Sequence, residues 1–156
     1  MFYAPESRPV IRQQIEEIIQ TEGPIYETLL KKRITNACGF TRAGGSIIDI
    51  LRQCLPDDLT MTEYAEKRVF WPRNVFPANY RDYRVGTDRD SKRAIDEIPP
   101  EELANAMYEI LVDFTSCDRD VLFRETLRLF GLNALTAKAR QYLDCALAVL
   151  QKAGRV

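Results

Sequence analysis

The sequence has no histidine among its 156 residues. This absence excludes Ser-His-Asp and Cys-His catalysis, zinc sites with an imidazole ligand, and histidine as a base that titrates near neutral pH. Cysteines are few, and Cys38, Cys54, Cys117 and Cys145 form no C-x-x-C pair. They lie among apolar residues or at helix edges, so we expect reduced, mostly buried thiols and neither a metal site nor a cofactor.

Long apolar runs are also absent. No run of about 18 apolar residues that could span a membrane is present. The first ten residues, MFYAPESRPV, lack the basic and apolar regions of a signal peptide. We therefore expect a cytoplasmic protein that contacts no membrane.

The excess of charge of either sign is small. The 22 basic and 23 acidic residues give a net charge of −1, and 46% of the residues are hydrophobic. These values are typical of a globular protein and argue against a disordered tail or a fibrous repeat. A basic surface can arise here only if the cations gather on one face.

The first half of the chain has the pattern of three short helices. The apolar positions of the first helix fall on one face, with Ser7 as a candidate N-cap and Gly23-Pro24 at its end. A second helix is predicted from about Tyr26 to Gly39, where glycine suits a left-handed cap. A third runs to Pro56. The apolar faces comprise Ile11, Ile15, Ile18 and Ile19; Leu29, Leu30, Ile34, Ala37 and Cys38; and Ile47, Ile50, Leu51 and Leu55.

Residues 59–72 (LTMTEYAEKRVFWP) are rich in β-branched and aromatic residues, which predicts a β-hairpin. Phe70 and Trp71 at its end are expected in the core. Three helices followed by a hairpin is the order of a winged helix, in which the second and third helices form a helix-turn-helix and the hairpin is the wing. We predict this unit over residues 1–72.

Residues 73–98 are predicted to be an ordered linker. The segment contains Pro77 and Gly86 and a run of mixed charge, RDYRVGTDRDSKR. Its aromatic residues indicate that it packs against other parts of the chain, and they are grouped near its start together with Trp71: Phe76, Tyr80 and Tyr83.

Residues 99–156 return to a helical pattern. Pro100 begins one helix, with Glu101 and Glu102 in its first turn. Asp118 is expected to cap a second helix and Thr136 a third. The predicted inward residues are Leu103, Met107, Ile110, Leu111 and Phe114; Val121, Leu122, Leu129 and Phe130; and Ala139, Tyr142, Leu143, Leu147 and Leu150.

An ungapped offset of 92 positions relates the two halves. It maps Ile11 to Leu103, Leu30 to Leu122 and Gly39 to Gly131, and only one core position fails, Ile34 against Thr126. Any two triplets of amphipathic helices can be aligned in part, but this single frame also matches both loops. The expected fold is thus mainly α (α+β), with tandem duplicated winged-helix-like units. The second copy stops at AGRV, so its wing is truncated.

Several stretches resemble a bacterial domain of unknown function: PVIRQQIEEIIQTEGPIYETLLKKRI, GFTRAGGSI, the FWP after the hairpin, and IPPEELANAM with RDVLFRETLRLFG. That domain lies near the C-terminus of very large superfamily-1 helicase-like proteins, often beside a Vsr-like endonuclease domain. The resemblance spans nearly the whole chain. It implies a module of helicase and nuclease machinery, with those domains of the parent polypeptide as partners and a role in defence against foreign DNA. It supplies no catalytic residues, and the truncated second wing departs from it.

The winged-helix position of the third helix identifies candidate DNA contacts. Arg42 and Ser46 would face bases, and Gly44-Gly45 would allow a close approach to phosphate. Each candidate also suits a solvated helix face, and Asp49 and Asp144 would repel phosphate. The full set of candidates is Lys31, Lys32, Arg42, Ser46, Arg81, Arg84, Lys138 and Arg140, with Arg33 and Gln141 beside them.

The basic residues of the linker have two interpretations. Arg81, Arg84 and their neighbours, with Tyr80 and Tyr83, could follow a nucleic-acid backbone. Alternatively, they form salt bridges with Asp82 and other nearby acids, which we slightly favour. Enzymatic interpretations are weaker, because Asp57-Asp58 and Glu101-Glu102 are adjacent acids and Gly44-Gly45 lacks the Lys of a P-loop. We expect a non-enzymatic nucleic-acid-binding module or, as the alternative, a protein-interaction module that docks onto the parent protein.

Overall fold

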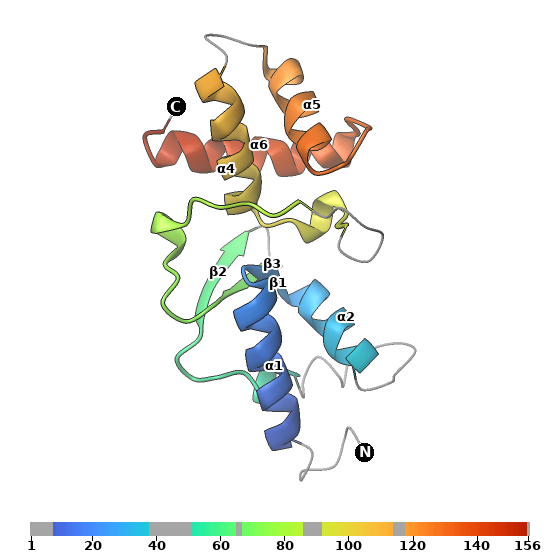
Figure 1. The fold of residues 1–156 in the computed structure, drawn as a ribbon, viewed down its shortest axis with the longest axis vertical. Helices are drawn as coiled ribbons and strands as arrows, with labels where there is room; N and C mark the ends of the chain where they lie inside the picture. Colours follow the sequence, from blue (N-terminus) through green and yellow to red (C-terminus); the bar gives the residue numbers. More distant parts are fainter. Residues whose placement is uncertain (1–7, 38–50, 65–66, 86–91, 114–117, 156) are drawn as a thin grey trace. The chain divides into compact units, whose positions relative to one another are not determined.

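The computed structural model describes residues 8–37, 51–64, 67–85, 92–113 and 118–155. The chain divides into two compact units, Met1–Phe76 (unit 1) and Pro77–Val156 (unit 2). The expected mainly α, α+β fold class is confirmed, with one small antiparallel sheet (Figure 1). No helix among the described residues is long and apolar enough to cross a membrane.

Unit 1 contains α1 (Arg8–Glu22), β1 (Ile25–Tyr26), α2 (Glu27–Ala37), β2 (Thr60–Tyr64) and β3 (Lys67–Trp71). The predicted hairpin is confirmed, because β2 pairs antiparallel with β3 from Thr60↔Trp71 to Tyr64↔Lys67. The chain before α2 adds a third strand, in which Ile25 pairs with Phe70. The sheet order is β1-β3-β2.

Two short features fix the packing of unit 1. The expected burial of Phe70 and Trp71 is confirmed, and the Trp71 indole N–H donates to Thr62 Oγ1 at 2.9 Å. Gly23, which directly follows α1, lies against the end of the hairpin. A Cβ at Gly23 would lie 2.4 Å from the Ile19 carbonyl oxygen and 2.7 Å from Pro72 Cδ. Only glycine allows this approach of α1 to β3.

Unit 2 contains the 3₁₀ turns η2 (Pro77–Asn79) and η3 (Ile95–Glu97), followed by α4 (Pro100–Asp113), α5 (Arg119–Leu129) and α6 (Ala137–Lys152). Helix α4 packs against both α5 and α6 (Figure 1). The predicted start at Pro100 and the Thr136 cap are confirmed, since Thr136 Oγ1 accepts from the Ala139 N–H. Asp118 occupies the N-cap position of α5, but its side chain makes no cap hydrogen bond.

Some predicted packing is wrong. Val121 was expected inward but is 45% exposed, because the buried face of α5 is rotated toward Phe123 and Leu127. Phe76 was expected to pack and is 63% exposed. The start of the second helix, predicted at about Tyr26, is confirmed to within one residue: α2 begins at Glu27, and Tyr26 pairs with Val69 of the hairpin in β1.

The helix bounds of the two halves keep the offset of 92 positions. Helix α1 begins at Arg8 and α4 at 100, which is 8 + 92; α2 spans 27–37 and α5 spans 119–129, which is the same range plus 92. Both members of the mismatched pair, Ile34 and Thr126, are buried. The Thr126 hydroxyl donates to the Leu122 carbonyl oxygen at 2.8 Å, so a polar side chain occupies this core position without an unsatisfied donor. The internal duplication stays a prediction, which these helix bounds favour.

Candidate nucleic-acid interface

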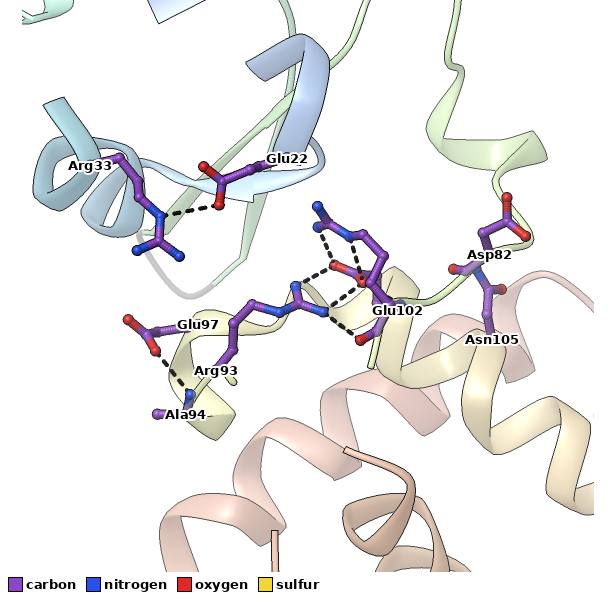
Figure 2. A network of polar contacts seen from close by, with 9 residues as sticks. Glu22, Arg33, Asp82, Arg93, Ala94, Glu97, Glu102 and Asn105 are labelled. Atoms are coloured by element: carbon purple, nitrogen blue, oxygen red, sulfur yellow. Dashed lines mark hydrogen bonds and ion pairs between the residues drawn. The ribbon is translucent and has the colours of Figure 1, made fainter. Parts of the chain in front are cut away.

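Helix α2 carries three consecutive cations, Lys31, Lys32 and Arg33. Lys32 is exposed, and Lys31 and Arg33 are half-buried. Arg33 Nε donates to Glu22 Oε1 at 3.1 Å, which ties α2 to the end of α1 (Figure 2). The candidates Arg42 and Ser46, with Gly44-Gly45, lie outside the described residues. The described candidates of unit 1 are therefore Lys31 and Lys32.

Two further cations lie on the hairpin and were not identified from the sequence. The Lys67 ammonium lies 5.5 Å from the centre of the Tyr26 ring, and Arg68 is opposite Glu63 in the strand register. The sequence shows only an adjacent Lys-Arg pair at the start of a strand. The contact of Lys67 with Tyr26 depends on the pairing of β1 with β3, which no local pattern predicts.

The candidate Arg84 belongs to a buried ionic cluster, formed by Arg84, Arg93 and Glu102. Arg84 Nη2 lies 2.9 Å and Arg93 Nη1 2.7 Å from Glu102 Oε2, and the Glu102 side chain has no exposed surface (Figure 2). Burial alone would raise the pKa of Glu102, but the hydrogen bonds from Arg93 and Arg84 outweigh it and hold that pKa below its ordinary value. This cluster fastens Arg84 and Arg93 to α4.

Salt bridging of the linker arginines was the slightly favoured interpretation, and the structure confirms it for Arg84. The partner is Glu102 on α4, however, and not Asp82. Asn105 makes a second attachment, since its amide donates to the carbonyl oxygens of Tyr80 and Asp82 at 3.2 and 2.8 Å. Tyr83 is attached as well, with its ring edge-to-face on Phe130 at 5.7 Å.

The two candidates on α6 both make ion pairs. Lys138 Nζ lies 2.7 Å from Asp96 Oδ2, and Arg140 Nη1 lies 2.6 Å from Asp120 Oδ1. The hydrogen bond with Asp96 raises the pKa of Lys138, and the one with Arg140 lowers that of Asp120. A phosphate group approaching either cation must compete with a carboxylate that is already bound.

Arg81 has a different environment from the other candidates. Its Nη1 donates to the carbonyl oxygens of Ala78 and Tyr80 at 3.0 and 2.9 Å. It lines a cavity of about 340 Å³ in unit 2, together with Arg155. The structure thus separates the unit 2 candidates into one arginine in the buried cluster, two cations in surface ion pairs, and Arg81 at a cavity.

Unit 1 contains a larger cavity, of about 470 Å³, beside Trp71. Glu16, Glu17 and Asp58 line it with Arg73, whose Nη1 lies 2.8 Å from Asp58 Oδ2. The three carboxylates outnumber the one guanidinium, so the net negative charge repels phosphate and disfavours this cavity as part of a nucleic-acid surface. Among the residues that the structure describes, no group of three or more Cys, Asp or Glu side chains is arranged to hold a metal ion.

The comparisons with known proteins give one similarity. Residues 1–49 match a family described as "Protein of unknown function (DUF3320)". The match covers α1, β1 and α2 and stops before the hairpin. The comparison with curated proteins and the comparison with solved structures found no match.

Proposed function

We propose that this chain is a non-enzymatic nucleic-acid-binding accessory module, and that unit 1 makes the primary contact. One observation carries the proposal: α1, β1, α2 and the β2–β3 hairpin follow one another with the sheet order β1-β3-β2. This order supports a winged helix, in which α2, with the cations Lys31 and Lys32, would be the first helix of the helix-turn-helix. The candidate recognition residues Arg42 and Ser46 would follow α2.

The biological setting of the module is a proposal of the same kind. The resemblance of the sequence motifs supports a place in a helicase and nuclease system that acts against foreign DNA. Under this proposal, the helicase and endonuclease domains of the parent polypeptide are its partners. The cytoplasm is then its expected location.

The charge of the chain limits the strength of such binding. With a net charge of −1, binding depends on a local group of cations, so we expect non-specific affinity in the micromolar range at low salt. The slope of log K against log salt is about −0.9 for each phosphate neutralised on a duplex. Few contacts therefore predict a shallow slope.

A duplex titration tests the proposal. Fluorescence anisotropy with a labelled duplex at several salt concentrations should give weaker binding and a shallower slope for the Lys31→Glu/Lys32→Glu variant than for the unaltered chain. The matched control is Lys92→Glu/Lys152→Glu, two exposed lysines of unit 2, which changes the net charge equally. Equal effects of the two variants, or no binding by the unaltered chain, would refute the proposal.

A protein-interaction module is the second candidate function. The observation in its favour is that Lys138 and Arg140 are neutralised by acids, whereas Tyr108 and Val112 are 37% and 64% exposed on one face of α4. Docking onto the parent protein predicts that Val112→Asp abolishes binding to its purified neighbouring domains and that Lys31→Glu/Lys32→Glu does not. The reverse pattern would exclude docking through this face.

A further inference from the structure

A second cationic feature of unit 2 lies outside the winged-helix positions. The cavity of about 340 Å³ is lined by two arginines from distant parts of the sequence, Arg81 and Arg155. Among the described residues, neither guanidinium forms an ion pair with a carboxylate. The other unit 2 candidates, Arg84, Lys138 and Arg140, are each paired with a carboxylate, so these two guanidinium groups differ from them.

The backbone of Arg155 is held in place by the end of α6. Gly154 adopts a φ of 71°, and its N–H donates to the Gln151 carbonyl oxygen at 3.1 Å. The Arg155 N–H donates to the Leu150 carbonyl oxygen at 3.0 Å. These two hydrogen bonds form a Schellman cap, which glycine favours because of its left-handed conformation. The cap directs the chain so that Arg155 follows the last turn in a fixed position.

The side chain of Arg155 is also oriented. Its guanidinium carbon lies 4.2 Å from the centre of the Tyr108 ring, a cation–π contact, and Nη1 donates to Asn105 Oδ1 at 2.8 Å. Asn105 is 4% exposed, and its amide nitrogen is bound to the carbonyl oxygens of Tyr80 and Asp82. The buried amide therefore cannot rotate without losing hydrogen bonds, and it holds the guanidinium in one orientation.

Arg81 is anchored by the backbone. Its hydrogen bonds to the Ala78 and Tyr80 carbonyl oxygens use Nη1 only. The same Tyr80 carbonyl accepts from Asn105, so one backbone group connects the supports of both arginines. Burial, and next the charge of Arg81, lower the pKa of Arg155. A bound anion would relieve the repulsion between these two charges.

Two carboxylates at the cavity restrict the ligand. Glu109 accepts from the Tyr83 hydroxyl at 2.7 Å, and Asp113 lies at the end of α4. Neither is within ion-pair distance of the arginines, and both repel anions. A ligand must therefore reach Arg81 and Arg155 with a small group of concentrated negative charge and strong acceptors. A phosphate suits this demand, because its oxygens accept paired hydrogen bonds from guanidinium groups.

We infer that Arg81 and Arg155 form a binding site for a phosphate group, oriented by Asn105 and Tyr108. The identification of that phosphate with the backbone of a nucleic acid rests on the proposed function. The site would then be a second contact of the protein with the nucleic-acid backbone. The sequence identified Arg81 as a candidate for such a contact, but not Arg155.

The inference is tested on the full chain with two probes, pyrophosphate and a labelled DNA duplex. Pyrophosphate should shift the Nε–Hε resonances of Arg81 and Arg155 in ¹⁵N-correlated NMR spectra and leave those of Arg128 unchanged. The Arg81→Gln/Arg155→Gln variant should lose at least about tenfold in duplex affinity, as expected for two charged hydrogen-bonding groups. Its salt slope should become shallower by about two units.

Matched variants separate binding from folding. Arg128→Gln removes an arginine of unit 2 that is 75% exposed and should leave duplex affinity unchanged. Asp113→Asn removes a repelling charge and should strengthen pyrophosphate and duplex binding, an increase that damage to the fold cannot produce. Thermal unfolding of Arg81→Gln/Arg155→Gln, compared with that of Arg81→Lys/Arg155→Lys, shows whether both remain folded.

The outcomes distinguish this inference from the proposed function. If Lys31→Glu/Lys32→Glu weakens duplex binding while Arg81→Gln/Arg155→Gln does not, and pyrophosphate shifts neither arginine, the phosphate site is wrong and the proposed function stands. If pyrophosphate shifts both arginines but no duplex binds, the site is supported with a small phosphate compound as its ligand, and the proposed function fails. If neither probe binds, both are overturned.

Discussion

Glu102 accepts hydrogen bonds from both terminal nitrogens of Arg93, Nη1 to Oε2 at 2.7 Å and Nη2 to Oε1 at 2.9 Å. This bidentate pair is nearly enclosed, since the Arg93 side chain is 10% exposed and that of Glu102 is not exposed. The pair joins the segment before α4 to the first turn of that helix. The charge of Glu102 is therefore a structural element of unit 2.

Removal of this charge should destabilise unit 2. Glu102→Gln leaves Arg93 and Arg84 without an anion, and breaking a buried pair from one side costs about 3 kcal/mol. The free energy of unfolding from urea titrations measures the change. Glu125→Gln is the matched control, because Glu125 pairs with Arg128 at the surface and should contribute less than about 1 kcal/mol. Equal losses for the two variants would contradict the buried cluster.

The neighbouring Glu101 predicts a dependence of stability on pH. Burial raises its pKa from 4.5 to about 7. Because the folded state binds this proton more tightly than the unfolded state, the contribution of Glu101 to stability is fully present below pH 4.5 and is lost as the pH rises toward 7. The loss amounts to at most about 3 kcal/mol. Urea unfolding of Glu101→Gln at pH 5 and pH 8 should show a smaller difference than the unaltered chain. An undiminished difference would mean that Glu101 titrates normally.

Gly23 provides a steric test of unit 1. A Cβ at this position would lie 2.4 Å from the Ile19 carbonyl oxygen and 2.7 Å from Pro72 Cδ. One of these atoms belongs to the backbone and the other to a rigid ring, so neither can move easily. We expect Gly23→Ala to destabilise unit 1 by about 2 kcal/mol or more. Gly154→Ala is the comparison, since nothing lies within 4 Å of its added Cβ and only the φ of 71° opposes it. That variant should lose about 1 kcal/mol by thermal unfolding.

Local signals predicted the parts of this fold that depend on local chemistry. The start of α4 at Pro100, the Thr136 cap and the hairpin each follow from residues within a few positions of the feature. Local signals did not predict strand β1, because its two residues form a strand only by pairing with Phe70 and Val69, which lie much later in the chain. The inward prediction for Val121 failed because the face of an amphipathic helix with several apolar residues is chosen by its neighbours.

The candidate site was less predictable than the fold for the same reason. The sequence shows that Arg84 and Arg81 are cations near acids. It does not show that Arg84 binds Glu102 or that Arg81 lines a cavity. Arg155 was missed because its role depends on Tyr108, which lies 47 positions earlier in the sequence. Contacts between residues so far apart in the sequence are set by tertiary packing, which composition and spacing do not specify.

Two ion pairs on α6 compete with any contact between this helix and a nucleic acid. Asp96 and Asp120 bind Lys138 and Arg140, so any contact of these cations with a nucleic acid must displace an existing ion pair. Asp96→Asn/Asp120→Asn should release both cations, raise duplex affinity and steepen the salt slope by about two units, one for each new phosphate contact. The control Asp82→Asn/Asp118→Asn removes two exposed acids of the same unit that form no ion pair among the described residues, and it changes the net charge equally. Anisotropy at 50 to 200 mM salt compares the variants, since a general charge effect would be the same for both. A gain no larger than that of the control would show that Lys138 and Arg140 do not contact the duplex, and that the binding surface of unit 2 lies elsewhere.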